Sequence, residues 1–380
     1  MRIRGQSPKL GSLCRWVRDI DAVSGLAEQL DLKPRNEREA ELLVVLDSIL
    51  RLTGPIDYSP LNAPPAGPII PRDPWDVRGS AKRRKTYDTV LDKTILQHCT
   101  VEIKSGFSII EQTPGPDRKP PNLHPATLHA SRDDTIALSP SHVKPQHHMH
   151  PIVPHLHLFQ DVLSPDECTQ IIAAGETIGF EPDAPVREVG EESSILAHNF
   201  YWLVDTAFCN KLWSRVEEFV PTTVAGKQVR GLNRRFRVYR YVPGAEYRAH
   251  IGKLCHFFER FHTYNSSDGA WPPSGTCPVS NNYIYDSSPP DAKQSSLFTF
   301  LIYLNDDFNA GETTFFLPSA REGSMNAYSV KPIQGSILMF PHGETEGSLL
   351  HEGTGVKRDD HPTAKYVIRT DVLYDINAKT

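Results

Sequence analysis

Residues 233–252 read NRRFRVYRYVPGAEYRAHIG, and this stretch decides the fold. Side chains alternate between the two faces of a β-strand, so Arg237, Tyr239 and Tyr241 are expected on one face. Pro243 and the glycine after it indicate a turn, and a second short run follows and reaches His250. The stretch therefore predicts two strands joined by a tight connection.

The rest of the chain from about residue 158 continues this pattern. Short runs of β-branched and aromatic residues alternate with Gly, Pro and Asn, and helices are expected only at 165–178 and 206–219. The run 365–374, KYVIRTDVLY, predicts a late strand with Lys365, Val367 and Arg369 on one face. We therefore expect a mainly β protein with flanking helices, built on a double-stranded β-helix, or jelly roll.

Two histidines stand where strands could bring them to one metal ion. His250 ends the second strand of the opening stretch, and His351 lies in the run LLHEG before the late strand. A non-haem Fe(II) site uses two histidines and one carboxylate, often with the first pair spaced as His-x-Asp on a strand. Here the position two after His250 is Gly252, which has no side chain that could bind a metal. The sequence Asp-Gly-x-Trp, which would supply the carboxylate if it followed Ile251 directly, begins only at Asp268.

Several segments, taken in order, resemble the prolyl 4-hydroxylase-like group of 2-oxoglutarate and Fe(II)-dependent dioxygenases. The resemblance covers about residues 158–376, and its motifs stand at 160–168, 233–244, 303–306, 311–315, 330–340 and 349–353. It implies His250, Asp268 and His351 as metal ligands and catalytic centre. It also implies Lys365, directly before an aromatic residue, as the partner of the far carboxylate of 2-oxoglutarate.

The resemblance leaves part of the co-substrate site open. Arg369 shares a strand face with Lys365 and could bind the same carboxylate in its place, because the loop around 357–361 is longer than usual for the family. Tyr241 is the candidate for a hydrogen bond to the co-substrate. Fe(II), 2-oxoglutarate, O2 and L-ascorbate are the expected cofactors and co-substrates, and the reaction implied is hydroxylation of a prolyl or other protein residue with release of succinate and CO2.

The interrupted motif has three interpretations. If residues 252–267 are an insertion, their removal joins His250-Ile251 to Asp268 and restores His-x-Asp; the bordering residues are compatible with splice-site codons, so a retained intron is our hypothesis. If the insertion is a true part of the protein and displaces Asp268, the chain is a non-catalytic module that binds iron or 2-oxoglutarate. If Gly252 is taken literally, the open ligand position resembles that of halogenases with this fold.

Composition and patterning suggest the organisation of the remainder. We expect a helical N-terminal region at 1–56 (with helices at 12–31 and 36–53), a Pro- and His-rich, largely irregular linker at 57–154, and the dioxygenase domain at 155–377. The net charge of −5 gives no nucleic-acid footprint, and no signal peptide or membrane span is visible. We therefore expect an intracellular protein, cytoplasmic or nuclear, that acts on a protein or small-molecule substrate and binds neither nucleic acid nor membrane.

Overall fold

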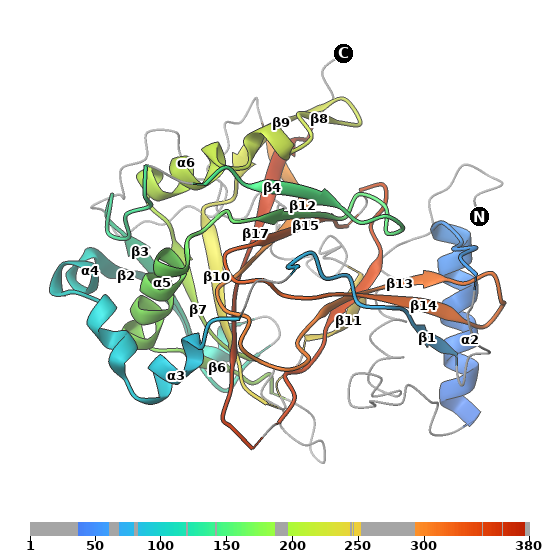
Figure 1. The fold of residues 1–380 in the computed structure, drawn as a ribbon, viewed down its shortest axis with the longest axis horizontal. Helices are drawn as coiled ribbons and strands as arrows, with labels where there is room; N and C mark the ends of the chain where they lie inside the picture. Colours follow the sequence, from blue (N-terminus) through green and yellow to red (C-terminus); the bar gives the residue numbers. More distant parts are fainter. Residues whose placement is uncertain are drawn as a thin grey trace.

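The computed structural model describes the chain from residue 37 to residue 376 with several gaps. The described residues are 37–60, 68–79, 83–118, 121–140, 143–186, 197–243, 245, 247–251, 293–343, 345–358 and 360–376. Two β-sheets face one another, with helices on the outer side of the larger sheet (Figure 1). The prediction of a mainly β, double-stranded β-helix fold with flanking helices is confirmed.

The larger of the two sheets, the major sheet, has a nine-strand path with three short strands attached to it. The path runs β2 (Phe107–Thr113), β3 (Ala126–Ser131), β7 (Ala197–Leu203), β10 (Arg235–Tyr241), β17 (Lys365–Asp375), β12 (Gln294–Tyr303), β15 (Ile337–Pro341), β5 (His157–Gln160) and β4 (Gln146–Met149). The attached strands are β6 (Glu181–Asp183) beside β7, and β9 (Lys227–Leu232), which pairs with β17 and with β8 (Thr223–Val224).

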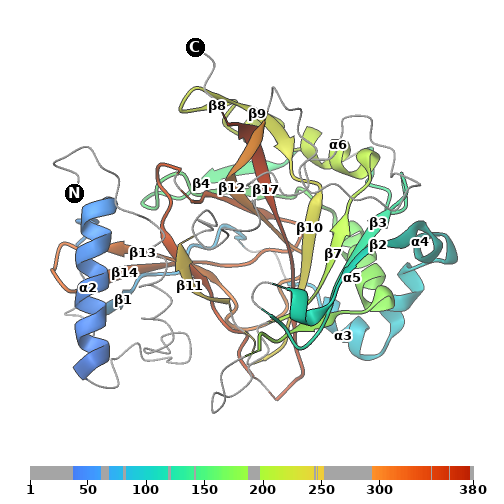
Figure 2. The same ribbon diagram turned by 180° about the vertical axis from the view of Figure 1, so that it is seen from behind.

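The smaller sheet, the minor sheet, has five strands. Its order is β1 (Ile69–Pro71), β14 (Met325–Val330), β13 (Thr313–Pro318), β16 (Leu350–Gly353) and β11 (Tyr247–Ile251). Helix α2 (Glu37–Thr53) lies against this sheet at the far side of the molecule from the other helices (Figures 1 and 2). Its Asp47 carboxylate accepts a hydrogen bond from the backbone N–H of Gly323 at 2.8 Å, so the helix is fixed to the turn between β13 and β14.

Helices cover the outer face of the major sheet. They are α3 (Thr86–Leu91), α4 (Val101–Gly106), α5 (Pro165–Ile178) and α6 (Thr206–Ser214), with 3-10 turns η3 (Thr94–His98), η4 (Gly115–Asp117) and η5 (Glu217–Phe219). Helix α5 begins with a capping box, in which Ser164 and Glu167 bond each other's backbone N–H groups. Among the residues that the structure describes, no helix is long and apolar enough to cross a membrane.

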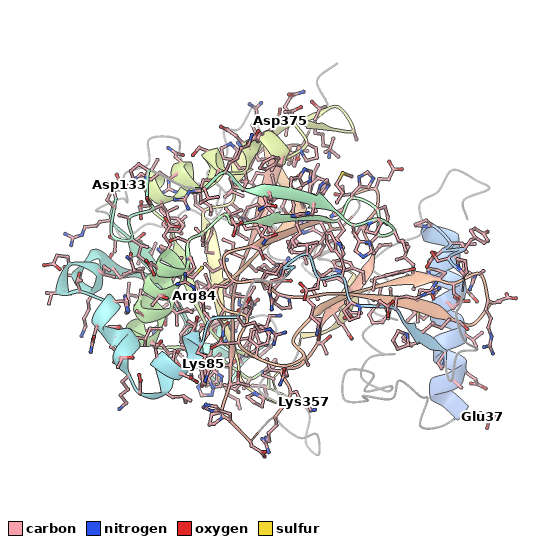
Figure 3. The ribbon with its side chains drawn as sticks, in the orientation of Figure 1. Glu37, Arg84, Lys85, Asp133, Lys357 and Asp375 are labelled. Atoms are coloured by element: carbon pink, nitrogen blue, oxygen red, sulfur yellow. The ribbon has the colours of Figure 1, made fainter. Side chains whose placement is uncertain are left out.

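Alternation along the central strands divides the core into two clusters. Tyr366 and Ile368 of β17 face the helices and pack with Phe236 and Phe300, whereas Val367 faces the minor sheet and packs with Phe315. Figure 3 shows that side chains fill the space around the sheets, with charged residues such as Glu37 and Lys357 at the periphery. The cluster between the two sheets, which contains Val367 and Phe315, is interrupted by polar side chains. These polar side chains form the candidate site.

The segment 57–154 differs from the irregular linker that the sequence suggested. It contributes β1 to one edge of the minor sheet, β2 and β3 to one edge of the major sheet, and β4 to the opposite edge. The strands in this segment lie at or near the sheet edges, where little apolar patterning is needed. Strands β1 and β3 pair with β14 and β7 far along the chain, whereas β2 pairs with β3 and β4 pairs with β5. Of the two N-terminal helices expected, 36–53 appears as α2, and 12–31 lies outside the described residues.

Candidate active site

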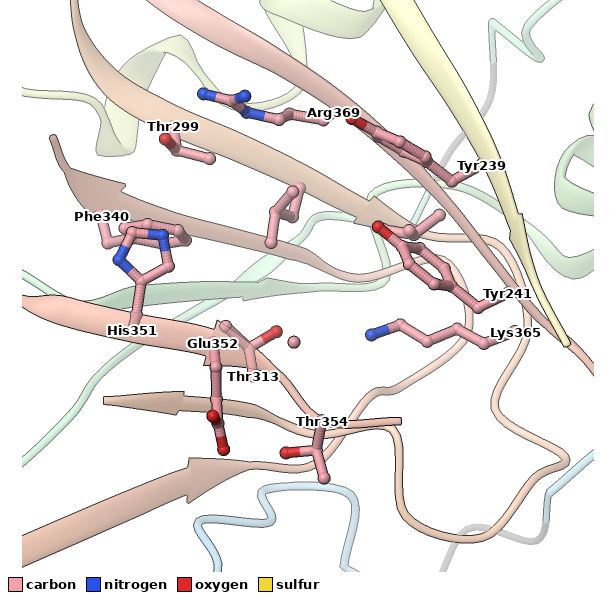
Figure 4. A pocket seen from close by; sticks show the side chains of 13 residues that line it. Tyr239, Tyr241, Thr299, Thr313, Phe340, His351, Glu352, Thr354, Lys365 and Arg369 are labelled. Carbon is pink, nitrogen blue, oxygen red and sulfur yellow. The ribbon is translucent and has the colours of Figure 1, made fainter. Parts of the chain in front are cut away.

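A pocket lies between the two sheets, and both contribute side chains to it (Figure 4). The major sheet supplies residues from β10, β12, β15 and β17, and the minor sheet supplies residues from β13 and β16. The lining residues are Tyr239, Tyr241, Thr299, Leu301, Thr313, Phe340, His351, Glu352, Gly353, Thr354, Lys365, Val367 and Arg369. Four of the residues predicted for the site, Tyr241, His351, Lys365 and Arg369, are therefore brought together.

His351 is held in a tautomer that suits metal binding. It is buried on β16, and its Nδ1 lies 3.0 Å from the backbone oxygen of Leu349. Because a carbonyl oxygen only accepts, Nδ1 carries the hydrogen and Nε2 carries the lone pair, the arrangement usual for a metal-ligating histidine. Phe315 stacks on the imidazole and Phe340 meets it edge-on, with ring centroids 5.7 and 4.7 Å away, so the ring orientation is fixed.

His250 occupies the position opposite His351 in the minor sheet. Strands β11 and β16 are antiparallel, and the register pairs His250 with His351 and Ile251 with Leu350. Positions directly opposite in an antiparallel pair belong to the same face of the sheet. The backbone therefore places the two histidine positions as neighbours on one face, although about a hundred residues separate them in the sequence.

Lys365 provides a buried cation at the other wall of the pocket. Its Nζ donates to the backbone oxygen of Gly311 at 2.8 Å and lies 5.7 and 5.5 Å from the ring centroids of Tyr241 and Tyr303. Burial lowers the pKa of this ammonium group to about 8, and the nearby Glu312 carboxylate partly opposes that shift. Glu312 forms its ion pair with Lys331, so a dianionic ligand entering the pocket would meet the Lys365 ammonium group as a buried cation.

Arg369 lies on the same face of β17 as Lys365 but closer to Thr299 and Tyr239 (Figure 4). Its side chain is 20% exposed, and its guanidinium lies 3.7 Å from the Asp371 carboxylate. Lys365, by contrast, is only 5% exposed and lies beside Tyr241. The two cations are therefore at different depths in one pocket, and they do not compete for one position.

Of the three residues predicted to share one strand face, Arg237, Tyr239 and Tyr241, only the two tyrosines line the pocket. The two tyrosines stack on each other, with ring centroids 5.5 Å apart. Arg237 lies farther along β10, where it pairs with Asp183 and with the side-chain oxygen of Asn199. These two contacts hold the Arg237 side chain outside the pocket lining.

Several polar residues of the site were not singled out from the sequence. Thr299 and Thr313 line the pocket, and Thr313 shares a 2.8 Å hydrogen bond with the hydroxyl of the fully buried Tyr303. Thr299 lies 2.9 Å from Nδ1 of the buried His342. The only signal for them was the alternation within their strands, which does not distinguish a pocket-lining threonine from an ordinary one.

The predicted carboxylate ligand, Asp268, and the whole insertion 252–267 lie outside the described residues. Within the part of the chain that the structure describes, no three His, Cys, Asp or Glu side chains form a group that could hold a metal ion. The residues present fit the expected metal in two respects, the tautomer of His351 and the placement of His250 opposite it. They fit a dicarboxylate co-substrate through Lys365.

The chain is similar in structure to several oxygenases. A viral collagen prolyl hydroxylase, vCPH, from Paramecium Bursaria Chlorella virus-1, in complex with 2OG, is 18% identical; the match covers 59% of this chain and 97% of that chain, with a TM-score of 0.32. A 2OG-Fe(II) oxygenase family oxidoreductase from Burkholderia pseudomallei is 13% identical, covering 60% and 88% with a TM-score of 0.32. A Pseudomonas putida prolyl-4-hydroxylase is 15% identical, covering 57% and 91% with a TM-score of 0.31.

Neither a protein-family model nor a curated protein sequence matches the chain. The geometry of the pocket, rather than these distant likenesses, supports the functional assignment.

Proposed function

We propose that the chain is an Fe(II)- and 2-oxoglutarate-dependent dioxygenase that hydroxylates a prolyl or other protein residue, with release of succinate and CO2. One observation carries this proposal: a metal-competent histidine and a buried lysine face a single pocket between two sheets, and the second histidine position lies directly opposite the first. This is the combination that a chelating dicarboxylate co-substrate requires.

Within this proposal each residue has a defined task. His351 and His250 hold the metal from adjacent strands, with Asp268 as the third ligand. Lys365 binds the far carboxylate of 2-oxoglutarate, because it is the more deeply buried cation and gains most from a charged partner in a site of low dielectric constant. Tyr241, which lies beside Lys365, donates a hydrogen bond to the same carboxylate. When bound, Fe(II) supplies O2-dependent oxidation of an unactivated C–H bond, coupled to decarboxylation of the co-substrate.

Arg369 then has a task different from the one first considered for it. Arg369 lies near Thr299, away from Lys365, and its side chain is partly exposed. We assign Lys365 to the co-substrate and leave Arg369 to contact the substrate as it approaches the metal.

The proposal is tested by mixing the protein with Fe(II) and 2-oxoglutarate without oxygen and recording the visible spectrum. Assembly of the site should give a weak charge-transfer band, and admission of oxygen should then release succinate. The experiment is run on the full chain and on a variant lacking 252–267. A band without succinate would favour a binding module, a chlorinated product would favour a halogenase, and no band in either form would contradict the metal site.

Sequencing the mature transcript across codons 245–275 tests the retained-intron hypothesis separately. A message that joins the codons of Ile251 and Asp268 supports it, and an uninterrupted message contradicts it.

A further inference from the structure

Lys365 is a buried cation whose counter-charge lies behind the wall of the pocket. Its Nζ donates to the backbone oxygen of Gly311 at 2.8 Å, and its side chain is almost fully buried. An ammonium group that has lost its water in this way loses its proton more easily, unless a negative charge lies nearby. The next residue after Gly311 is Glu312, and its carboxylate raises the pKa of Lys365 while burial lowers it. The charge of Lys365 therefore depends on a residue that does not line the pocket.

The register of the minor sheet places Glu312 beside a second cation. Strands β13 and β14 are antiparallel, and Thr313 pairs with Val330 at the end of their ladder. Glu312 and Lys331 are the next positions along the two chains, and their side chains form an ion pair. Thr313 lines the pocket, whereas Glu312 and Lys331 do not, as alternation along a strand predicts. The ion pair is therefore outside the pocket, on the far side of its wall.

Backbone hydrogen bonds fix both members of the ion pair. The backbone oxygen of Glu312 accepts from the N–H of Thr354 at 2.9 Å. The N–H of Lys331 donates to the backbone oxygen of Trp75 at 3.0 Å, and the N–H of Trp75 donates to that of Ser329 at 2.8 Å. The pair is thus held by the minor sheet and by the N-terminal segment that borders it.

The three charged groups have different effects on an anion in the pocket. Without Glu312, the Lys365 ammonium group would keep only a backbone oxygen and the faces of the rings of Tyr241 and Tyr303 as partners. Without Lys331, the Glu312 carboxylate would repel an entering carboxylate, because like charges interact strongly in a site of low dielectric constant. The Glu312–Lys331 pair therefore supports the charge of Lys365 and adds little net negative charge of its own.

The other ionisable groups around this ammonium group come from four strands. Tyr241 of β10 and Tyr303 of β12 present their rings to it, and burial raises the pKa of the Tyr303 hydroxyl well above its ordinary value. Glu352 of β16 and Arg369 of β17 line the same pocket (Figure 4). Within the part of the chain that the structure describes, Glu312 is the charged group that shifts the pKa of the ammonium group.

We propose that Glu312 and Lys331 are positioning residues for Lys365: Glu312 keeps the buried ammonium group charged, and Lys331 offsets the negative charge that an entering anion would otherwise meet. The proposal rests on the proposed function only for the identity of that anion, a dicarboxylate. It means that an ion pair behind the wall sets the charge that the pocket presents to its ligand.

The titration of Lys365 tests this proposal on the full chain without metal or co-substrate. Carbon NMR of protein labelled with carbon-13 at lysine Cε follows each ammonium group with pH, and Lys365→Arg identifies the resonance. Glu312→Gln should lower the pKa of Lys365 by about 1, and Lys331→Gln should raise it, because an attractive charge is removed in one variant and a repulsive charge in the other. Lys331→Arg keeps the positive charge and should leave the pKa in place.

An exposed ion pair elsewhere supplies the matched controls. The Lys144 ammonium group lies 3.2 Å from the carboxylate of Glu218, which belongs to η5 in the helical layer. Lys144→Gln and Glu218→Gln make the same two chemical changes away from the pocket. Both should leave the pKa of Lys365 unchanged.

The affinity for 2-oxoglutarate, from anaerobic calorimetry with Fe(II), gives a second readout. At about pH 6 Lys365 is charged in the parent and in Glu312→Gln, so the variant should bind at least as tightly as the parent. At about pH 9 the variant should bind about tenfold more weakly, because a smaller fraction of its Lys365 is charged. A purely structural loss would weaken binding alike at both pH values, and that result would overturn the proposal.

The NMR titration has two further outcomes that would overturn it. They are an unchanged pKa of Lys365 in either Glu312→Gln or Lys331→Gln, and shifts in the same direction in both. Lys331 is partly exposed, so its substitution still tests the pair if Glu312→Gln fails to fold. Absence of the charge-transfer band with both opposite shifts present would contradict the proposed function and leave the roles of Glu312 and Lys331 standing.

Discussion

At the scale of single residues, Lys365 decides how the pocket treats a dicarboxylate. It is nearly inaccessible to solvent, donates to a backbone oxygen and lies between two tyrosine rings. Lys365→Met should therefore weaken 2-oxoglutarate binding about a hundredfold or more, because one partner of a buried charge pair is lost. Anaerobic titration calorimetry in the presence of Fe(II) measures this loss.

Two further variants serve as comparisons for that measurement. Lys365→Arg keeps the charge and should retain part of the affinity, and Lys357→Met, which removes an exposed lysine, should bind as the unmodified chain does. An undiminished affinity in Lys365→Met, with the affinity lost instead when Arg369 is substituted, would assign the carboxylate to Arg369.

The lowered pKa of Lys365 predicts a pH dependence of co-substrate binding. Burial brings the pKa of the free site to about 8, so the ammonium group loses its charge as the pH rises through that value. A bound carboxylate favours the charged form, so binding takes up a proton above pH about 8, and affinity should fall about tenfold for each further pH unit. Lys365→Arg should bind with an affinity that stays flat over the same range, and a parallel decline in both proteins would refute the assignment.

At the scale of elements, the sequence predicted strands and helices well where they carry their own signals. The helix expected at 165–178 is present with those bounds, and Ser164 and Pro165 at its start are typical helix-initiating residues. The pairing of the two histidine-bearing strands was not predicted. Nothing local to β11 or β16 shows that His250 and His351 are cross-strand partners, because register depends on the pairing of segments far apart in the sequence.

The cap of helix α5 offers a direct test at this scale. Ser164→Ala removes the acceptor for the backbone N–H of Glu167 and should lower the free energy of unfolding by about 1 kcal/mol. Ser105→Ala, at an exposed serine whose hydroxyl donates to the backbone oxygen of Glu102 and caps no helix N-terminus, should lie within about 0.5 kcal/mol of the parent. Urea denaturation measures both, and equal values for the two variants would contradict the capping role.

At the scale of the whole molecule, the N-terminal part of the chain is integral to both sheets. A sequence rich in proline and histidine gave no sign of this, since β1 to β4 lie at or near sheet edges and two of them, β1 and β3, pair with strands far along the chain. Which strands this segment pairs with becomes visible only in the folded structure. Of the residues expected in the site, Tyr241, His351, Lys365 and Arg369 line one pocket, and their roles toward a metal and a dicarboxylate stay predictions.

Truncation measures how far the sheets depend on that segment. A chain beginning at residue 37 keeps every described element and serves as the reference. A chain beginning at residue 155 loses α2, β1, β2, β3 and β4 and exposes new sheet edges, so its unfolding should be broad and its aggregation faster. Identical thermal unfolding of the two truncated chains would show that residues 57–154 do not stabilise the sheets.

The most direct test of the central claim is the visible spectrum with Fe(II) and 2-oxoglutarate in the absence of oxygen. The protein, or its variant lacking 252–267, should show a weak charge-transfer band, and both His351→Ala and His250→Ala should abolish it while leaving thermal unfolding near that of the parent. The absence of a band from both parent forms, or a band that survives His351→Ala, would contradict the assignment of the pocket as an iron and 2-oxoglutarate site.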